Sequence, residues 1–575
     1  MKFFIGLSVL LAIGCCKVAA QGDRVTIRPY HEGWCTDAQD PIVAAFQRMQ
    51  KPEIPGIELN TGWHWVLGQE GEKLVAIEIP TTGGKPIQLP HRILQPDRAI
   101  WYTQTLDLSE QSYCIISADD GAQLFVNGKQ VPRLEGNIFK LPMMAKAAVS
   151  VRVLNNAMEG GLRSVRMVRE SDFLAWRESC NAYERVERLA KKQILLGDET
   201  TRFYVAEAVA RPTPKNIEIA ESCFKGYPLL VGPWITRHGK QTWISVWAEP
   251  EYPVALWMGN DSLPLQEHAV QQGEVLHFEL GDQATEKFWY RLQSGNVATS
   301  VYRVQLSDQT TQPFSFWADS QSGWHVFGQH LSQQEWQHDA FTVGVGDLVG
   351  NGSDRAAWQH FFGLLSTHAA KQPVYLVPGN HDYDGYADEL RPLWFQKLVP
   401  RRPVNYFSWY AENCGFIALD PNENFPIGVT PGSSQYEWLR KELESDAWHQ
   451  ADWRFIMIHQ TLYSQGWAGY QGDKVLRNLL EPLLEKAKVD VVVSGHTHDY
   501  ERLTRKYGNQ SVTYMVLGGA GGPLEPEASS AQPVMDKLVK TYHIARVFVD
   551  DSQLRWEVRN LEGKMIDQFA LKKMN

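Results

Sequence analysis

The sequence predicts a multidomain protein in which N-terminal β-sandwiches are followed by a C-terminal α/β domain. Two patterns along the chain lead to this prediction. Short alternating strands separated by turn residues fill most of the first part, and from Pro313 onward apolar strands alternate with amphipathic helices, as in a layered α/β domain. Of the 575 residues, 43% are hydrophobic, and the formal net charge is -10. This is the composition of a globular protein, and because the chain has no long basic run, we expect no nucleic-acid binding.

The N-terminus has the features of a targeting segment. Lys2 gives a short basic start, the apolar run 3–14 is too short to cross a bilayer comfortably, and small residues follow it. Cleavage after Ala20 fits the small-x-small rule, so residues 1–20 are predicted to be a signal peptide. An alternative is lipid attachment at Cys15, because LAIGC loosely resembles a bacterial lipobox. No other segment resembles a transmembrane helix. We therefore expect an exported protein that is periplasmic, at the cell surface or secreted.

Residues 22–170 are predicted to form a β-sandwich. Runs such as IWYTQTLDL, SYCIISA and AVSVRVLNN are separated by turn residues. The sequence VNGK, Val126–Lys129, is a hairpin signal, because Asn-Gly fits the two positive-φ positions of a type I′ turn. The stretch from Pro80 to Ser164 resembles the jelly-roll, galactose-binding-like domain of family 2 glycoside hydrolases. This resemblance implies carbohydrate as a candidate partner, although such domains also serve only to pack against their neighbours.

Residues 171–200 are predicted to be a helical linker, because FLAWRESCNAYERVERLAKKQILL places apolar residues at helical spacing. Residues 201–310 are predicted to return to short strands, among them QTWISVWAE, YPVALWMG and KFWYRLQSG. The number and spacing of these strands favour a second sandwich, of the fibronectin type III kind. The strand FWYRLQSG followed by YRVQL resembles the N-terminal domain of purple acid phosphatases.

Residues 311–575 form the predicted α/β domain. Its strand candidates are FSFWA, FTVGV, PVYLV, GFIAL, WRFIMI and VDVVV. Five of these strands lead into residues that can bind a metal: Asp319, Asp347, Asn380 with His381, His459, and His496 with His498. Sheets of this class bind ligands at the carboxyl ends of their strands. Five such endings are too many for coincidence, so we expect the side chains to form one site.

The ordered set D-x-Q, GDLVGNG, GNHD, H and GHTH resembles the calcineurin-like metallophosphoesterase superfamily over residues 313–571. GHTHDYER and HQTLYS favour its purple acid phosphatase branch. The resemblance implies a four-layer α-β-β-α domain that holds two divalent metal ions. The implied metal ligands are Asp319, Gln321, Asp347, Asn380, His459, His496 and His498. Asp347 would bridge the ions, with Asp319 and His498 in one site and Asn380, His459 and His496 in the other. His381 would contact the phosphate and protonate the leaving oxygen.

The chemistry explains why such a set is needed. Phosphate esters resist attack because their oxygens repel nucleophiles. Two divalent metals roughly 3.5–4 Å apart neutralise that charge and turn bound water into hydroxide near neutral pH. The resemblance thus implies a binuclear phosphoesterase that uses Mn, Fe, Zn or Mg, and the N-terminal targeting segment predicts that it is exported.

The sequence departs from the family pattern at two positions. Gln321 stands where the superfamily has histidine, and it can coordinate only through a neutral carbonyl oxygen, which favours Mn or Fe over Zn. Gly350 stands where the purple branch has a tyrosine that binds ferric iron. We therefore expect a colourless protein without a stable ferric site.

Several functions stay open at this point. A phosphomonoesterase that acts on a small-molecule or glycan-linked phosphate ester is favoured on fold analogy. A phosphodiesterase is an alternative, and so is a glycan-binding surface protein with a vestigial phosphatase domain. A glycoside hydrolase would need two carboxylates on a barrel domain, and the chain shows no eightfold strand–helix pattern.

Three nearby features are expected to play lesser parts. His325 and His330 are expected on the surface of a helix, with a place lining the pocket as the alternative. Glu501 and Arg502 are expected to pair with each other and to orient the ligands. The glycine-rich stretch Leu517–Pro526 lacks the GK[ST] of a nucleotide P-loop, so we expect a flexible loop beside the site.

Overall fold

The computed structural model describes residues 24–28, 30, 40–72, 78–95, 98–155, 159–197, 199–239, 241–281, 287–306, 312–333, 339–383, 385, 391–400, 404–411, 413–550 and 552–573. The predicted signal peptide and Cys15 lie outside these residues. Within them, no helix is both long and apolar enough to span a membrane. The chain divides into two compact units. The first comprises Met1–Pro55, Leu174–Leu306 and Phe362–Pro373, and the second comprises Gly56–Phe173, Ser307–Phe361 and Val374–Asn575.

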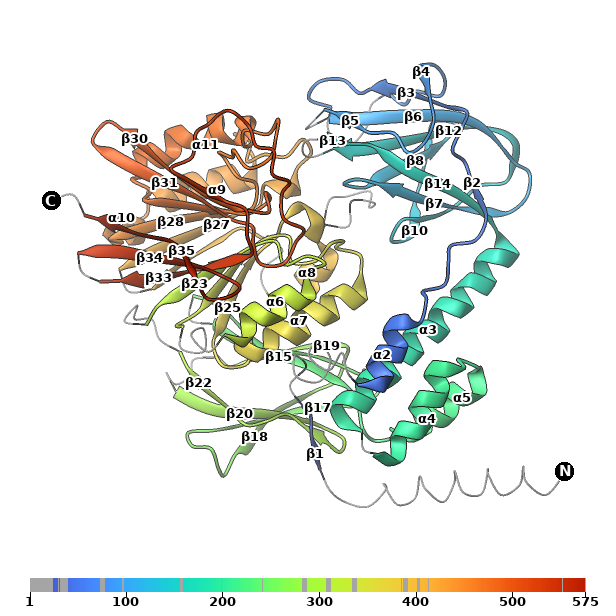
Figure 1. Ribbon diagram of the computed structural model, residues 1–575, viewed down its shortest axis with the longest axis horizontal. Helices are drawn as coiled ribbons and strands as arrows, with labels where there is room; N and C mark the ends of the chain where they lie inside the picture. The colour runs from blue at the N-terminus through green and yellow to red at the C-terminus, as the bar shows by residue number, and fades with distance from the viewer. Residues whose placement is uncertain are drawn as a thin grey trace. The chain divides into compact units, whose positions relative to one another are not determined.

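The first unit combines helices with short strands (Figure 1). Its helices are α2 (Pro41–Arg48), α3 (Glu170–Leu196) from Leu174 onward, α4 (Glu199–Ala210) and α5 (Pro214–Ser222). One sheet has the order β1-β21-β20-β17-β18, with β22 also paired to β20. These strands are β1 (Val25–Thr26), β17 (Val254–Gly259), β18 (Gln266–Gln271), β20 (Lys287–Ser294), β21 (Val297–Ala298) and β22 (Tyr302–Gln305). A further antiparallel group, in the order β19-β16-β15, consists of β15 (Leu230–His238), β16 (Gln241–Ala248) and β19 (Val275–Glu279).

The helical part of this unit is longer than the sequence predicts. Strands are expected from residue 201 onward, but helices continue to Ser222. The signal for the last helix is local: Thr213 accepts a hydrogen bond from the backbone N–H of Asn216 at 3.2 Å, and Pro214 occupies the first helical position. Both are typical of a helix N-terminus. The fibronectin type III topology stays a prediction.

Residues Gly56–Phe173 of the second unit, hereafter the N-terminal β region, form two antiparallel sheets. One has the order β10-β11-β7-β14-β2 and the other β4-β3-β6-β12-β8-β9. The strands are β2 (Ile57–Glu58), β3 (Trp63–Leu67), β4 (Lys85–Ile87), β6 (Arg98–Leu108), β7 (Ser112–Ala118), β8 (Ala122–Val126), β9 (Lys129–Val131), β10 (Arg133–Glu135), β11 (Ile138–Lys140), β12 (Met144–Asn155) and β14 (Leu162–Arg169), with a separate pair, β5 (Ile93–Leu94) and β13 (Glu159–Gly160).

Both sheets of the N-terminal β region contribute to one buried core, with Tyr102 and Val151 from one sheet and Ile116 and Val165 from the other. The predicted hairpin is present between β8 and β9. Its central residues are Asn127 and Gly128, with φ angles of 49° and 75°. The relation to a jelly-roll domain stays a prediction.

The remainder of the second unit, hereafter the α/β region, is built on two sheets. In the first, six neighbouring strands have the order β25-β24-β23-β33-β34-β35. They are β23 (Phe314–Trp317), β24 (Thr342–Val345), β25 (Pro373–Val377), β33 (His543–Val549), β34 (Gln553–Asn560) and β35 (Met565–Lys572). The second has the order β26-β27-β28-β29-β31-β30-β32. These strands are β26 (Phe407–Ala411), β27 (Cys414–Leu419), β28 (Trp453–Ile458), β29 (Val491–Ser494), β30 (Tyr500–Tyr507), β31 (Gln510–Leu517) and β32 (Lys537–Val539).

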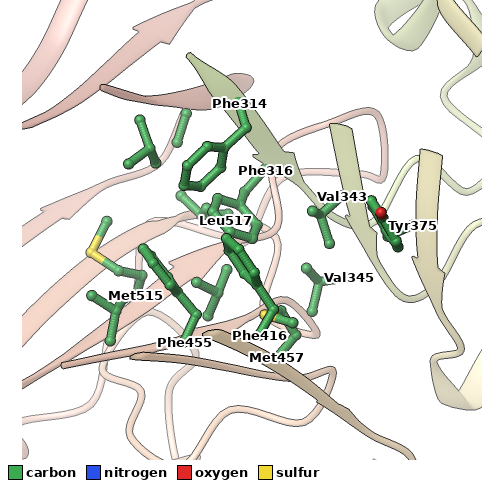
Figure 2. Packing of buried hydrophobic residues seen from close by; sticks show 14 of the residues in the cluster. Phe314, Phe316, Val343, Val345, Tyr375, Phe416, Phe455, Met457, Met515 and Leu517 are labelled. Carbon is green, nitrogen blue, oxygen red and sulfur yellow. The ribbon is translucent and has the colours of Figure 1, made fainter. Parts of the chain in front are cut away.

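All six predicted strands of this region are present. Their apolar side chains meet in one core between the two sheets, which Figure 2 shows: Phe314 and Phe316 from the first sheet pack against Phe416 and Phe455 from the second. A buried strand has apolar side chains on both faces, which is why these runs are continuous rather than alternating. Continuous apolar runs are a strong sequence signal, which explains why the predicted strands agree with the observed ones.

Helices flank these strands. They are α6 (Trp324–Ser332), α7 (Arg355–Ala369), α8 (Leu393–Leu398), α9 (Ser434–Leu443), α10 (Asp446–Gln450) and α11 (Lys474–Lys486). A second buried cluster joins Leu439 of α9 and Leu480 of α11 to Ile417, Ile456 and Val492 of the second sheet. These strand residues alternate with those of the first cluster, so α9 and α11 cover the outer face of that sheet. The four-layer order as a whole stays a prediction.

Candidate metal centre

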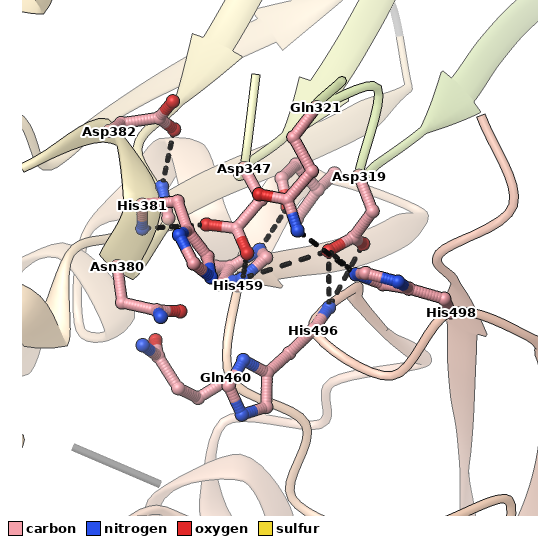
Figure 3. A network of polar contacts seen from close by, with 12 residues as sticks. Asp319, Gln321, Asp347, Asn380, His381, Asp382, His459, Gln460, His496 and His498 are labelled. Carbon is pink, nitrogen blue, oxygen red and sulfur yellow. Dashed lines mark hydrogen bonds and ion pairs between the residues drawn. The ribbon is translucent and has the colours of Figure 1, made fainter. Parts of the chain in front are cut away.

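The predicted site residues meet at the carboxyl ends of strands from both sheets of the α/β region. Asp319 follows β23, Asp347 follows β24, Asn380 and His381 follow β25, His459 follows β28, and His496 and His498 follow β29. Figure 3 shows these side chains converging, together with Gln321, while Asp382 lies at the edge of the group. Parallel strands present their carboxyl ends at a common edge, which brings residues far apart in the sequence together.

Three of these residues have a left-handed backbone conformation, which residues other than glycine rarely adopt. The φ angle is 61° at Asp319, 51° at Asp347 and 73° at His496. A left-handed conformation at a residue other than glycine costs on the order of 1–3 kcal/mol and persists only where its surroundings over-determine it. The clustering of three such residues at the strand ends marks this place as a functional site.

Asp347, His459 and His496 form the centre of the group. Their ligand atoms all lie within 4.8 Å of one another, and the three side chains are buried. Nε2 of His459 is 3.1 Å from Oδ2 of Asp347. Nδ1 of His459 is 2.8 Å from the carbonyl oxygen of Val345, so Nδ1 acts as the donor to that oxygen and Nε2 faces the centre.

Asp319, Gln321 and His498 lie beside this group. Nε2 of His498 is 3.4 Å from Oδ1 of Asp319 and 3.1 Å from the amide nitrogen of Gln321. Nδ1 of His498 is 2.6 Å from the carbonyl oxygen of Pro523, which again leaves Nε2 facing inward. Asp319 also accepts a hydrogen bond from the backbone N–H of His496 at 2.9 Å. The two sets of predicted ligands are therefore adjacent.

Several buried polar atoms of this group have no hydrogen-bond partner within the described part of the chain. Among them are Nε2 of His459, Nε2 of His496, Oδ1 of Asn380 and Oε1 of Gln321. Leaving such an atom unpaired costs about 1–3 kcal/mol. Imidazole nitrogens and amide and carboxylate oxygens are ligands for Mn, Fe and Zn. These atoms, with the carboxylates of Asp319 and Asp347, thus fit metal ions that would supply the missing partners.

The pKa values show how strongly the charges of the group interact. Burial lowers the pKa of His459, but the carboxylates of Asp347 and Asp319 outweigh burial and raise that pKa to about 10. Burial also lowers the pKa of His498, but Asp319 outweighs burial and raises that pKa to about 9. Burial and the neighbouring His459 lower the pKa of His496 to about 3. Because metal ions bind neutral imidazole, metal binding would release protons from His459 and His498.

His381 lies at the edge of the centre and is partly buried. Its backbone N–H donates to Oδ1 of Asp347 at 2.9 Å, and its Nδ1 is 3.2 Å from the carbonyl oxygen of Gly350. Beneath it, the buried Asp382 accepts hydrogen bonds from the backbone N–H groups of Leu348, at 2.9 Å, and Gly379, at 2.8 Å. These bonds tie the two strand-end loops together and hold His381 beside Asp347.

Two expectations about neighbouring residues are wrong. Glu501 and Arg502 do not pair: Glu501 accepts from the hydroxyl of Ser464 at 2.6 Å, and Arg502 bonds to Asp567 at 2.8 Å. Successive residues of strand β30 point to opposite faces of the sheet, which prevents the pair. His330 is fully buried rather than on the surface of its helix.

Asp420 is a polar residue of this region that sequence reasoning missed. It follows β27, is fully buried, and accepts hydrogen bonds from the hydroxyl of Tyr383 at 2.6 Å and the amide of Asn405 at 2.9 Å. The signal was available, because GFIALD is another apolar strand that ends in aspartate. Asp420 is not one of the grouped metal-type residues, and it braces Tyr383 near the loop of His381.

Comparison with known proteins finds relatives among the phosphoesterases. Residues 313–500 match the family model of the calcineurin-like phosphoesterases. The chain is 25% identical over 253 residues to purple acid phosphatase 22 of Arabidopsis thaliana. This alignment covers 42% of this chain and 56% of that protein. It is 27% identical over 186 residues to Fe(3+)-Zn(2+) purple acid phosphatase 12 of the same plant. This second alignment covers 31% of this chain and 38% of that protein. The chain spans about half the length of the curated relatives it matches.

Among solved structures, a purple acid phosphatase from yellow lupin (Lupinus luteus) seeds has a TM-score of 0.52 at 13% identity. That similarity covers 83% of this chain and 92% of the lupin chain, and at this identity it shows the fold alone. The resemblance carried by GNHD and GHTHDYER is confirmed. Residues 313–500 are a calcineurin-like phosphoesterase domain, and its homologues include purple acid phosphatases.

Proposed function

We propose that the chain is an exported, binuclear metal-dependent phosphoesterase and that phosphate monoesters are its substrates. The main observation behind this proposal is the cluster of three buried side chains, Asp347, His459 and His496, whose ligand atoms lie within 4.8 Å of one another. The match of residues 313–500 to a phosphoesterase family supports it. The substrate class, a small-molecule or glycan-linked monoester, follows from fold analogy.

The proposed metal centre uses all the ligands that the sequence predicts. They are Asp319, Gln321, Asp347, Asn380, His459, His496 and His498, with Asp347 shared by both sites. When bound, two divalent ions would neutralise the charge of the phosphate and lower the pKa of water. The neutral carbonyl oxygens of Gln321 and Asn380 are hard ligands, so Mn or Fe is favoured over Zn, with Mg also suited.

His381 is proposed as the group that protonates the leaving oxygen. With Nδ1 donating to the carbonyl oxygen of Gly350, the other ring nitrogen is the one that can reach a substrate. The hydrogen bond from its backbone to Asp347 fixes its distance from the centre. A general acid must lie within hydrogen-bond reach of the oxygen that it protonates, and the place of His381 beside Asp347 supports this role.

A role for carbohydrate is proposed only for the N-terminal β region. The second unit contains a cavity of about 950 Å³, lined partly by Trp101, Glu70 and Glu78 of this region and by Phe425. Aromatic side chains with carboxylates are a common lining of small-molecule sites. Binding of the full chain to a glycan array would support this role, and binding to no glycan would remove it.

The test of the proposed function is hydrolysis of p-nitrophenyl phosphate and bis-p-nitrophenyl phosphate by protein without residues 1–20. Metals are stripped and then returned one at a time as Mn, Fe, Zn or Mg. Metal-restored turnover of the monoester is expected, and preference for the diester would assign a phosphodiesterase instead. No turnover with any metal by folded protein would support the alternative of a glycan-binding protein with a vestigial phosphatase domain.

A further inference from the structure

A turn of the N-terminal β region lies against the metal centre. The turn connects β7 to β8 and contains Asp119, Asp120 and Gly121. Oδ1 of Asp120 accepts a hydrogen bond from the side-chain amide nitrogen of Asn380 at 3.4 Å, across 260 positions of the sequence. Both residues belong to the second unit. A side chain outside the phosphoesterase domain therefore contacts one of the proposed metal ligands.

The turn is fitted closely to the loop that follows Asn380. A Cβ atom on Gly121 would lie 2.2 Å from the carbonyl oxygen of Gly385, and one on Gly385 would lie 2.1 Å from that of Asp120. The φ angles of the two glycines are 111° and 64°, both in the left-handed region. Only glycine lets two backbones approach this closely, so both sides of the contact depend on their residue type.

The turn is also held firmly on its own side. The backbone N–H of Asp119 donates to the carbonyl oxygen of Gly161 at 3.2 Å, and its carboxylate pairs with Arg163. The backbone N–H of Leu154, in β12, donates to the carbonyl oxygen of Gly121 at 3.4 Å. Asp120 is therefore presented from a braced turn of the sheet.

The contact with Asp120 selects which end of the Asn380 amide faces the centre. Only the carbonyl oxygen of an amide can bind a cation, because the amide nitrogen offers donors alone. The carboxylate of Asp120 takes up the nitrogen, and Oδ1 of Asn380 is left buried without a partner in the described residues. A carboxylate behind a ligand fixes its orientation and makes it more basic, and losing such a partner typically costs about 10–100-fold in metal affinity or activity.

We propose that Asp120 is a positioning residue for Asn380, so that the N-terminal β region completes the metal centre of the phosphoesterase domain. This inference rests on the proposed function, since it requires Asn380 to bind a metal ion. It gives the N-terminal β region a part in metal binding, whether or not that region also binds carbohydrate.

The test compares metal binding by full-length variants, measured by titrating metal-stripped protein with Mn²⁺ and counting free Mn²⁺ by electron paramagnetic resonance. Asp120→Ala should weaken one of the two sites by about 10–100-fold. Asp120→Asn, which keeps an acceptor but loses the charge, should weaken it less. Asp107→Asn is the control in the same region, because this exposed side chain accepts a hydrogen bond from the backbone N–H of Ser109, away from the turn, and both metal sites of the variant should match the wild type.

A double-mutant cycle separates positioning from a general effect on folding. In an Asn380→Ala background, Asp120→Ala should cause no further loss of Mn²⁺ affinity, because the ligand that it positions is gone. Equal losses in both backgrounds, or wild-type affinity in Asp120→Ala, would overturn the inference while leaving the proposed function intact. Failure of the wild-type protein to bind Mn²⁺ would overturn both. If Asp120→Ala does not fold, Asp120→Asn carries the same comparison.

Discussion

The imidazole of His459 and the carboxylate of Asp347 form a buried pair, with 3.1 Å between Nε2 and Oδ2. The pair ties the end of β28 in one sheet to the loop after β24 in the other. Without a metal ion His459 stays protonated beside Asp347, since burial lowers the pKa of His459 but the carboxylates of Asp347 and Asp319 outweigh burial and raise that pKa to about 10. In the proposed metal centre the same two atoms would be ligands, so a proton and a metal ion would compete for Nε2 of His459.

Asp347→Asn should therefore abolish hydrolysis and change the titration of His459. We expect turnover of p-nitrophenyl phosphate to fall by more than about 100-fold, because losing a residue that only supports a metal ligand already costs about 10–100-fold. The pKa of His459 should fall in the metal-free protein, which NMR titration of the imidazole can follow. Asp354→Asn is the control, because Asp354 is an exposed helix cap that asparagine replaces well. Retained turnover in Asp347→Asn would refute the site.

A second prediction concerns Gly522, which lies against the ring of His498. A Cβ atom at this position would be 2.8 Å from Cε1 of His498 and 3.0 Å from Nδ1. Gly522→Ala should displace the imidazole and weaken one metal site by about 10-fold or more. Gly428→Ala is the control, because its nearest new contact would be an ordinary 3.6 Å. Equal Mn²⁺ affinity in the two variants would show that the loop containing Gly522 shifts to accommodate the new methyl group and leaves His498 in place.

Acid should destabilise the fold through two buried histidines outside the centre. Burial lowers the pKa of His330 to about 3 and that of His543 to about 4, from 6.5. Below pH 6.5 the unfolded chain binds protons at these residues while the folded chain does not, so stability falls as the pH drops. The loss is at most about 1.4 kcal/mol per pH unit for each histidine.

His330→Leu should reduce this acid sensitivity. Urea unfolding of metal-free protein between pH 4.5 and 7.5 would show a shallower fall in the free energy of unfolding for the variant. His325→Leu is the matched control, because His325 is exposed on the same helix. If His330→Leu and His325→Leu lose stability equally on acidification, burial of His330 is not the cause.

The colour of the iron-loaded protein tests the departure at Gly350. The purple branch owes its colour to a tyrosinate on ferric iron, and glycine has no side chain that could take this role. We expect no strong visible absorption when the stripped protein is loaded with iron in air. A strong visible band would mean that another tyrosine binds the iron, and the assignment of Gly350 would be wrong.

The sequence predicts the α/β region well because its signals are local and strong. Runs such as PVYLV and WRFIMI are continuous and apolar, and each coincides with a buried strand, β25 and β28. The metal-type residues that follow the strands need only the rule that carboxyl ends share an edge. The same rule would have found Asp420.

Other features could not be predicted in this way. Glu501 and Arg502 are neighbours in sequence, but the pleat of β30 separates them, and that requires knowing the face of each strand. The contact between Asp120 and Asn380 joins residues 260 positions apart, and no local pattern marks either one for the other. Helix α4 was missed because its apolar residues show no clear one-sided spacing.

The most direct test of the central claim is the number of metal ions that the wild-type chain binds. Metal-stripped protein without residues 1–20 would be titrated with Mn²⁺, dialysed and analysed for bound metal, with turnover of p-nitrophenyl phosphate followed in parallel. We predict two ions per chain, with turnover restored as the second ion binds, and fewer than two in His496→Ala. Folded wild-type protein that binds no Mn²⁺, Fe, Zn or Mg at these residues would contradict the account.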